Sequence, residues 1–95
     1  MQPLSISKTI TRTWCGRPGK QFTIHFDRSL KGKRVVVTQW LDFSSEVTLR
    51  AITGDGRTDN FREFAVIRTT TRGDWQTEAA RIARSLADEH FAVQS

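Results

Sequence analysis

Four cationic side chains crowd into the eight-residue segment 27–34, namely Arg28, Lys31, Lys33 and Arg34. The segment lies between two runs of strand-forming residues, so it is expected to be a hairpin turn, with Gly32 in the left-handed conformation. Lysine and arginine side chains on a turn suit contact with phosphate groups, because charge neutralisation releases counterions without demanding strict geometry. The competing interpretation is an ordinary solvated turn.

The sheet surface beside this turn is the second candidate. If Phe22, Ile24 and Phe26 point towards a covering helix, the alternate residues point away from it. Aromatic and basic side chains on that open face can stack on bases, as in proteins that bind single strands. The residues predicted to bind nucleic acid or another anion, on the turn and on this face, are Arg17, Lys20, His25, Arg28, Lys31, Lys33, Arg34, Trp40 and Arg50.

The tryptophans of this predicted surface have a second interpretation. Trp14 could join Trp40 on the open face. Tryptophans are more often buried in a core or in a dimer interface, however, where their large apolar area is removed from water. With three tryptophans and no tyrosine in the chain, the sequence does not indicate a rich stacking platform.

Residue types that support catalysis or metal binding are sparse. Cys15 could act as a nucleophile with His25 or His90 as its base, but nothing local distinguishes it from a small turn residue. The polar loop around Asp55 and Asp59 lacks the twelve-residue calcium pattern and its closing glutamate. Two histidines and one cysteine give no zinc set. We therefore predict that the protein is not an enzyme and that it uses no metal or cofactor.

The charge is concentrated in the first part of the chain. The 15 Lys and Arg residues outnumber the 10 Asp and Glu residues, which gives a net charge of +5. Residues 1–58 carry ten cationic and four acidic residues, whereas residues 59–95 carry five and six. Such an asymmetry is typical of a protein with an acidic partner, such as nucleic acid or an acidic protein surface.

The length and the composition predict one small soluble domain over residues 1–95. With 37% hydrophobic and 26% charged residues, the chain is neither disordered nor fibrous. A single cysteine allows no internal disulfide, so we expect a reducing, cytoplasmic compartment. No apolar run approaches the ~20 residues of a membrane helix, and the first residues do not resemble a signal peptide.

Five strands are expected before one helix. Alternating or β-branched runs predict strands over residues 4–14, 21–26, 34–43, 46–52 and 61–70. In the first, Leu4, Ile6, Ile10 and Trp14 should share one face. Residues 15–19, with two glycines and a proline, should form a turn. The short connections favour an antiparallel meander or a small curled sheet.

The hydrophobic period changes to that of a helix after residue 73. Trp75, Ala79, Ile82 and Leu86 lie on one stripe, so a helix is expected over residues 74–93 with Asp74 as its N-cap. One helix can cover only one face of the sheet. The predicted fold is therefore α+β: a five-stranded antiparallel sheet with one C-terminal amphipathic helix packed on one face.

Two functions remain open for this fold. The first is a small basic protein that binds nucleic acid or another polyanion through the cationic turn and the adjacent sheet face. The alternative is a protein–protein interaction module, such as a small phage or mobile-element adaptor or inhibitor that acts on a host protein. In that case the edge strand 4–14 and exposed aromatic residues would form the interface, and a homodimer is one form of it.

Overall fold

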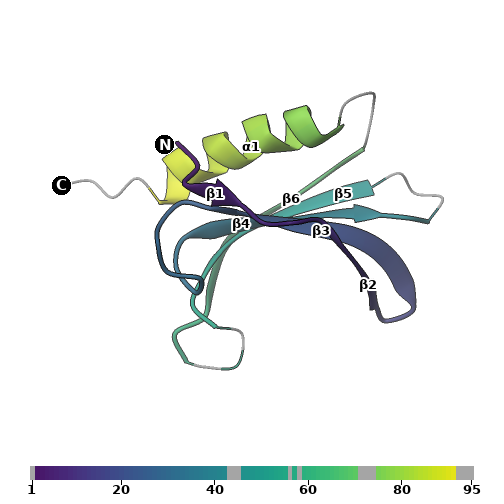
Figure 1. The fold of residues 1–95 in the computed structure, drawn as a ribbon, viewed down its shortest axis with the longest axis horizontal. Helices are drawn as coiled ribbons and strands as arrows, with labels where there is room; N and C mark the ends of the chain where they lie inside the picture. The colour runs from purple at the N-terminus through teal and green to yellow at the C-terminus, as the bar shows by residue number, and fades with distance from the viewer. Residues whose placement is uncertain (1, 43–45, 56, 58, 71–74, 92–95) are drawn as a thin grey trace.

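The computed structural model describes residues 2–42, 46–55, 57, 59–70 and 75–91. These residues form an antiparallel sheet with a helix on one of its faces (Figure 1), which confirms the predicted α+β fold. The elements in chain order are β1 (Ser5–Ile6), β2 (Ile10–Trp14), β3 (Arg17–His25), β4 (Arg34–Trp40), β5 (Glu46–Thr53), β6 (Arg62–Thr70) and α1 (Trp75–His90). The helix bounds are close to the expected 74–93; residues 74, 92 and 93, with the predicted N-cap, lie outside the described residues.

The sheet follows the chain from one edge to the other. Its strand order is β1-β3-β4-β5-β6, and β2 pairs with β3 beside β1. Every pairing is antiparallel, as short connections between sequential strands require. The predicted first strand, 4–14, is thus two strands that occupy the same edge.

A bulge separates these two edge strands. Between the pairs Ile6↔Ile24 and Ile10↔Gln21, the edge advances four residues while β3 advances three, so the edge holds one extra residue. Ser7 sits in the break, where its N–H donates to the Thr23 carbonyl (2.9 Å) and its hydroxyl accepts from the Thr23 N–H (2.8 Å).

The bulge reverses which residues face the helix. An extra residue shifts the two-residue alternation of a strand by one position. Ile6 therefore shares the helix-facing side with Ile24, while Ile10 and Trp14 point to the opposite face. The expectation that these apolar residues share one face was wrong for this reason.

The hairpin between β2 and β3 turns in two residues instead of the expected five. Cys15 (φ 50°) and Gly16 (φ 82°) both have positive φ, as a type I′ turn requires, and Trp14 pairs directly with Arg17. Strand β3 therefore begins at Arg17 and not at position 21. The missing N–H of Pro18 would lie on the side of β3 that faces β4. There the Pro18 carbonyl accepts a hydrogen bond from Leu41 N (2.9 Å), just beyond the end of β4, so proline is tolerated at this position.

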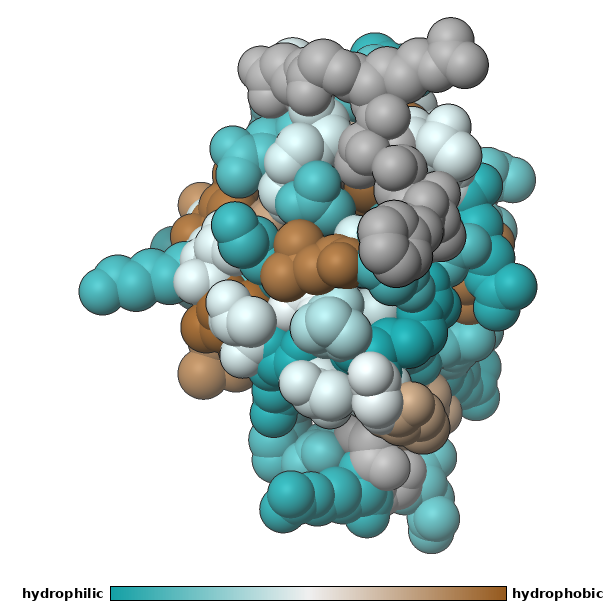
Figure 2. Space-filling model, turned by 90° about the vertical axis from the view of Figure 1, so that its right-hand side faces the viewer, coloured by the Kyte–Doolittle hydropathy of each residue, from teal (hydrophilic) through white to brown (hydrophobic). Residues whose placement is uncertain are grey.

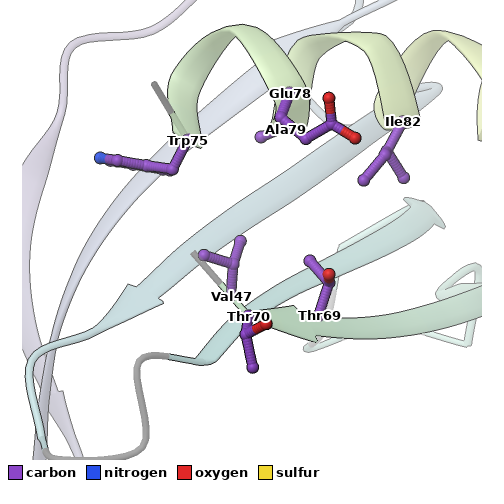
Figure 3. Close-up of a pocket in the computed structure, with 7 residues that line it drawn as sticks. All are labelled: Val47, Thr69, Thr70, Trp75, Glu78, Ala79 and Ile82. Atoms are coloured by element: carbon purple, nitrogen blue, oxygen red, sulfur yellow. The ribbon is translucent and has the colours of Figure 1, made fainter. Parts of the chain in front are cut away.

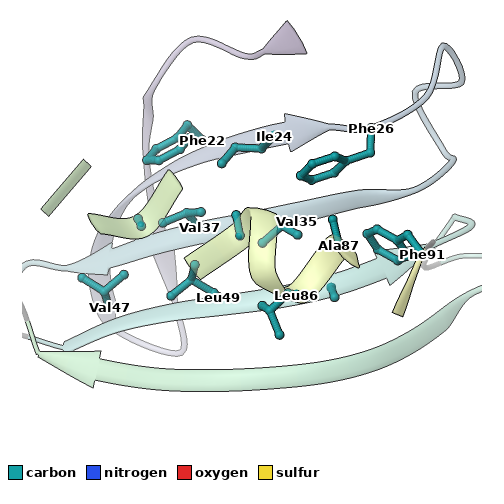
Figure 4. Close-up of a cluster of buried hydrophobic side chains, with 13 residues drawn as sticks. Phe22, Ile24, Phe26, Val35, Val37, Val47, Leu49, Leu86, Ala87 and Phe91 are labelled. Atoms are coloured by element: carbon teal, nitrogen blue, oxygen red, sulfur yellow. The ribbon is translucent and has the colours of Figure 1, made fainter. Parts of the chain in front are cut away.

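The hydrophobic core lies between α1 and the sheet (Figure 4). Phe22, Ile24 and Phe26 point towards the helix, as predicted, and Phe22 contacts Trp75 with ring centroids 5.7 Å apart. Each large side chain buried here contributes roughly 1.5–3 kcal/mol. The other buried members of the core are Val35, Val37, Val47, Leu49, Ala51, Ala79, Ala83, Leu86, Ala87 and Phe91. No helix formed by the described residues has the length and apolar character needed to cross a membrane.

Candidate functional site

The face of the sheet opposite α1 carries five of the nine predicted site residues. The strand register places Arg17, His25, Arg34, Trp40 and Arg50 on this helix-free face. The β2–β3 hairpin and the loop that follows β5 both curve away from α1, so the helix-free side of the molecule is concave between them (Figure 1). Lys20 is different, because it alternates with Gln21 and lies on the helix side of β3.

Two tryptophans and two arginines form a cluster at the β2–β3 hairpin end of this face. The rings of Trp14 and Trp40 meet edge to face, with centroids 5.4 Å apart and planes at 80°. The Arg17 guanidinium carbon lies 4.1 Å from the Trp40 ring centroid, and that of Arg12 lies 5.9 Å from the Trp14 ring centroid. Both distances suit cation–π attraction. We call Arg12, Trp14, Arg17 and Trp40 the Trp–Arg cluster.

The backbone beneath the cluster explains how its rings fit together. A Cβ atom at Gly19 would lie 3.1 Å from both Trp14 Cζ3 and Thr38 Cγ2, so the absent side chain makes room for the Trp14 ring. Trp40 is fixed separately, because its Nε1–H donates to Thr48 Oγ1 at 3.0 Å. Both indole rings therefore have defined orientations.

Acidic neighbours hold Arg17 in place above Trp40. Its Nε–H donates to Asp42 Oδ2 at 2.7 Å, and Glu46 Oε1 lies 3.6 Å from Nη1. The hydrogen bond to Asp42 raises the pKa of the Arg17 guanidinium, and the nearby carboxylate charges add to the effect. The guanidinium is fixed over the indole and still partly exposed, with 40% of its side-chain surface accessible.

The remainder of the helix-free face mixes paired and solvent-facing charges. Arg50 donates through Nε to Glu63 Oε2 at 2.7 Å, across the β5–β6 pair. Arg68 is exposed on β6, opposite Thr48. His25 lies at the far end of the face, where its buried Nδ1 has no hydrogen-bond partner among the described residues.

The cationic turn 27–34 is held by its own carboxylate. Asp27 accepts hydrogen bonds from the backbone N–H groups of Ser29 (3.0 Å) and Lys33 (2.8 Å). Lys33 also donates through Nζ to the Phe91 carbonyl at 3.2 Å, just past the end of α1. This cation therefore satisfies a terminal carbonyl of the helix.

Two further cations of the turn bind the loop that follows β5. Arg34 donates to the carbonyls of Gly32 (3.0 Å) and Gly54 (2.6 Å), and burial lowers the pKa of its guanidinium. Lys31 Nζ lies 2.9 Å from Asp55 Oδ2, and its hydrogen bond lowers the pKa of the Asp55 carboxyl. Arg28, the fourth cation of the turn, forms no hydrogen bond or ion pair with the described part of the chain.

The structure thus divides the predicted site between two ends of the molecule. Arg17 and His25 are eight residues apart on β3, a separation of about 26 Å. The Trp–Arg cluster lies at one end, and the turn with Arg34 lies at the other. Trp40 and Lys31 cannot contact the same small ligand, but both can contact an extended one.

The cavity beneath the start of α1 is too small for an organic ligand. The cavity between α1 and the β5–β6 strands (Figure 3) has a volume of about 20 Å³, which is enough for roughly one water molecule. Cys15 is exposed at the hairpin tip. Among the residues that the structure describes, no three His, Cys, Asp or Glu side chains gather closely enough to hold a metal ion.

The hairpin end of the molecule has a mixed surface. Figure 2 views this end, and its hydrophobic patches are separated by hydrophilic side chains. Such a surface suits a ligand that offers both charged and flat apolar groups.

Comparison with protein-family models, with curated proteins and with solved structures finds no match to this chain.

Proposed function

We propose that the protein binds single-stranded nucleic acid across the helix-free face of its sheet. The observation that carries this proposal is the Trp–Arg cluster, in which Arg17 lies over Trp40 and Trp14 meets Trp40 at its edge. Indole rings and guanidinium planes both stack on bases, and guanidinium groups also contact phosphates. A concave surface suits a flexible strand, whose bases can leave the stack.

The charges on this face favour a polyanion. Among the described residues, five arginines lie on this face (Arg12, Arg17, Arg34, Arg50 and Arg68), and three carboxylates pair with Arg17 or Arg50 (Asp42, Glu46 and Glu63). At the opposite end, Arg28 and the largely exposed Lys31 extend the cationic surface. In this proposal the base contacts come from the cluster and the phosphate contacts come from both ends. The protein acts in the cytoplasm as a binding protein, without a catalytic step.

Binding should be measured with a labelled single strand of about 12 nucleotides, as DNA and as RNA, by fluorescence anisotropy across a salt series. The variant Arg12→Gln with Arg68→Gln removes two cations from the helix-free face. We expect it to lose affinity by about tenfold and to show a shallower salt dependence, because fewer counterions are released.

A matched control removes the same charge from the outer face of α1. Arg81 and Arg84 are exposed there, on the other side of the sheet. The variant Arg81→Gln with Arg84→Gln should change the affinity by less than about twofold, since it leaves the proposed surface intact. Equal losses in both variants, or binding that does not respond to salt, would contradict the proposed site.

A further inference from the structure

The helix side of the sheet has an uncovered margin next to β1. α1 packs mainly on β4 and β5, and β3 with Phe22 lies to one side of it (Figure 4). Beyond β3, the edge strand β1 carries Ile6 on the helix side with 57% of its surface exposed, and Leu4 is equally exposed. These exposures are large for aliphatic side chains on the core side of a sheet.

A hollow of about 150 Å³ lies between this edge and the flank of α1. We call it the β1 groove; its lining residues are Ile6, Ser7, Thr9, Phe22, Gln76 and Ala80. Three of its lining residues, Ile6, Phe22 and Ala80, are apolar, and no acidic side chain lines it. The groove is distinct from the Trp–Arg cluster, which lies on the other face of the sheet.

The spacing of the strands leaves room for a second helix beside α1. Neighbouring strands are about 4.8 Å apart. A helix centred over β1 and β3 would therefore lie two strand spacings, about 9.6 Å, from a helix centred over β4 and β5. Packed helices have interaxial distances of about 8–10 Å. Addition of a strand at this edge is disfavoured, because the bulge at Ser7 interrupts the edge backbone.

The charge beside the groove identifies the kind of helix. Lys8 lies between two lining residues, and Lys20 is exposed on the same side of β3 as Phe22. A second copy of this chain would bring the same lysines and another charge of +5. An acidic helix with one apolar stripe would instead pair its carboxylates with the lysines and bury Ile6.

We propose that the β1 groove binds an acidic amphipathic helix of a partner protein. The probe is a synthetic 18-residue peptide with leucine on one stripe and glutamate elsewhere, titrated into the full ¹⁵N-labelled chain. The matched peptide has lysine in place of glutamate. The glutamate peptide should shift the amide signals of residues 4–9, Phe22, Gln76 and Ala80, and the lysine peptide should bind at least about tenfold more weakly.

Two variants with the same type of change test the location. Ile6→Asp places a charge in the groove, and Val66→Asp places one on the opposite edge strand, where Val66 is 43% exposed. Ile6→Asp should weaken binding of the glutamate peptide by about tenfold or more, whereas Val66→Asp should leave it unchanged. Both should keep the helical circular dichroism of the parent chain, and Ile6→Asp, which lies on the helix side, should also keep its oligonucleotide affinity.

Three outcomes would overturn the proposal. The first is a set of signal shifts that lies away from the groove, or none at all. The second is equal binding of the two peptides, which would remove the role of Lys8 and Lys20. The third is the detection of a homodimer by sedimentation that the Ile6→Asp variant does not form. That result would mean that the β1 groove binds a second copy of the chain.

Discussion

Gly54 and Gly16 have nearly the same backbone angle, φ 81° and φ 82°, but different surroundings. A Cβ atom at Gly54 would lie 2.2 Å from the carbonyl oxygen of Asn60, whereas at Gly16 it would meet nothing within 4 Å. Gly16→Ala should therefore lower the free energy of unfolding by only about 1–2 kcal/mol, which is the cost of placing alanine in the left-handed conformation. Gly54→Ala should lower the free energy of unfolding by about 2 kcal/mol more than that, because the backbone at Asn60 must also move.

Thermal and urea denaturation of the two glycine variants would measure this difference. The two changes are chemically the same, so the unfolded chains are affected equally and the difference reports the native packing. Equal destabilisation would mean that the loop after β5 can adjust at little cost. The contact between Gly54 and Asn60 would then not define the end of β5.

The partners of the cationic side chains are what the sequence could not predict. Lys31, Lys33 and Arg34 are equivalent as charges on a turn, and the sequence treats them alike. In the structure each has a different protein partner: a carboxylate, a carbonyl beyond the helix, and two loop carbonyls. Those partners lie between 2 and 58 positions away along the chain, so most of them cannot be predicted from the local sequence.

At the scale of elements, Lys33 joins the turn between β3 and β4 to the end of α1. Lys33→Met keeps most of the aliphatic stem but removes the hydrogen bond to the Phe91 carbonyl, so it should lower the free energy of unfolding by about 1 kcal/mol. Lys31→Met removes an exposed ion pair and should cost at most about 0.5 kcal/mol. Chemical denaturation of both variants tests the contrast; a larger loss for Lys31→Met would show that the loop contact matters more.

The elements themselves were largely predictable, because each strand or helix has its own period. Alternation in β3 identified Phe22, Ile24 and Phe26 as core, and the 3.6-residue stripe identified α1. The bulge near Ser7 was not predictable in this way, since one extra residue leaves no mark in residue type. It is nevertheless the bulge that carries Trp14 to the helix-free face.

The hairpin turn at Cys15 shows a different limit. Gly16 signals a turn, but the sequence offers Gly19 and Pro18 as well, so the turn could be placed anywhere among them. The structure uses the first possibility, and Pro18 and Gly19 extend β3. The Trp–Arg cluster could not be assembled from sequence because it depends on both the bulge and this turn.

The whole molecule has a core on one side of its sheet and the proposed binding surface on the other. Val37 and Val66 show this asymmetry within one sheet: Val37 is fully buried under α1, and Val66 is 43% exposed on the helix-free face. Val37→Ala should lower the free energy of unfolding by about 2 kcal/mol, because two buried methyl groups leave a void. Val66→Ala should cost no more than about 0.5 kcal/mol.

Urea unfolding curves with a shared slope would give both values. The contrast matters for function, because a face that contributes little to stability can vary its side chains for binding while the fold persists. A loss at Val66 as large as that at Val37 would mean that the helix-free face is covered in solution, as it would be in a dimer. The oligonucleotide would then have to compete with that second copy for the Trp–Arg cluster, and its affinity would fall as the protein concentration rises.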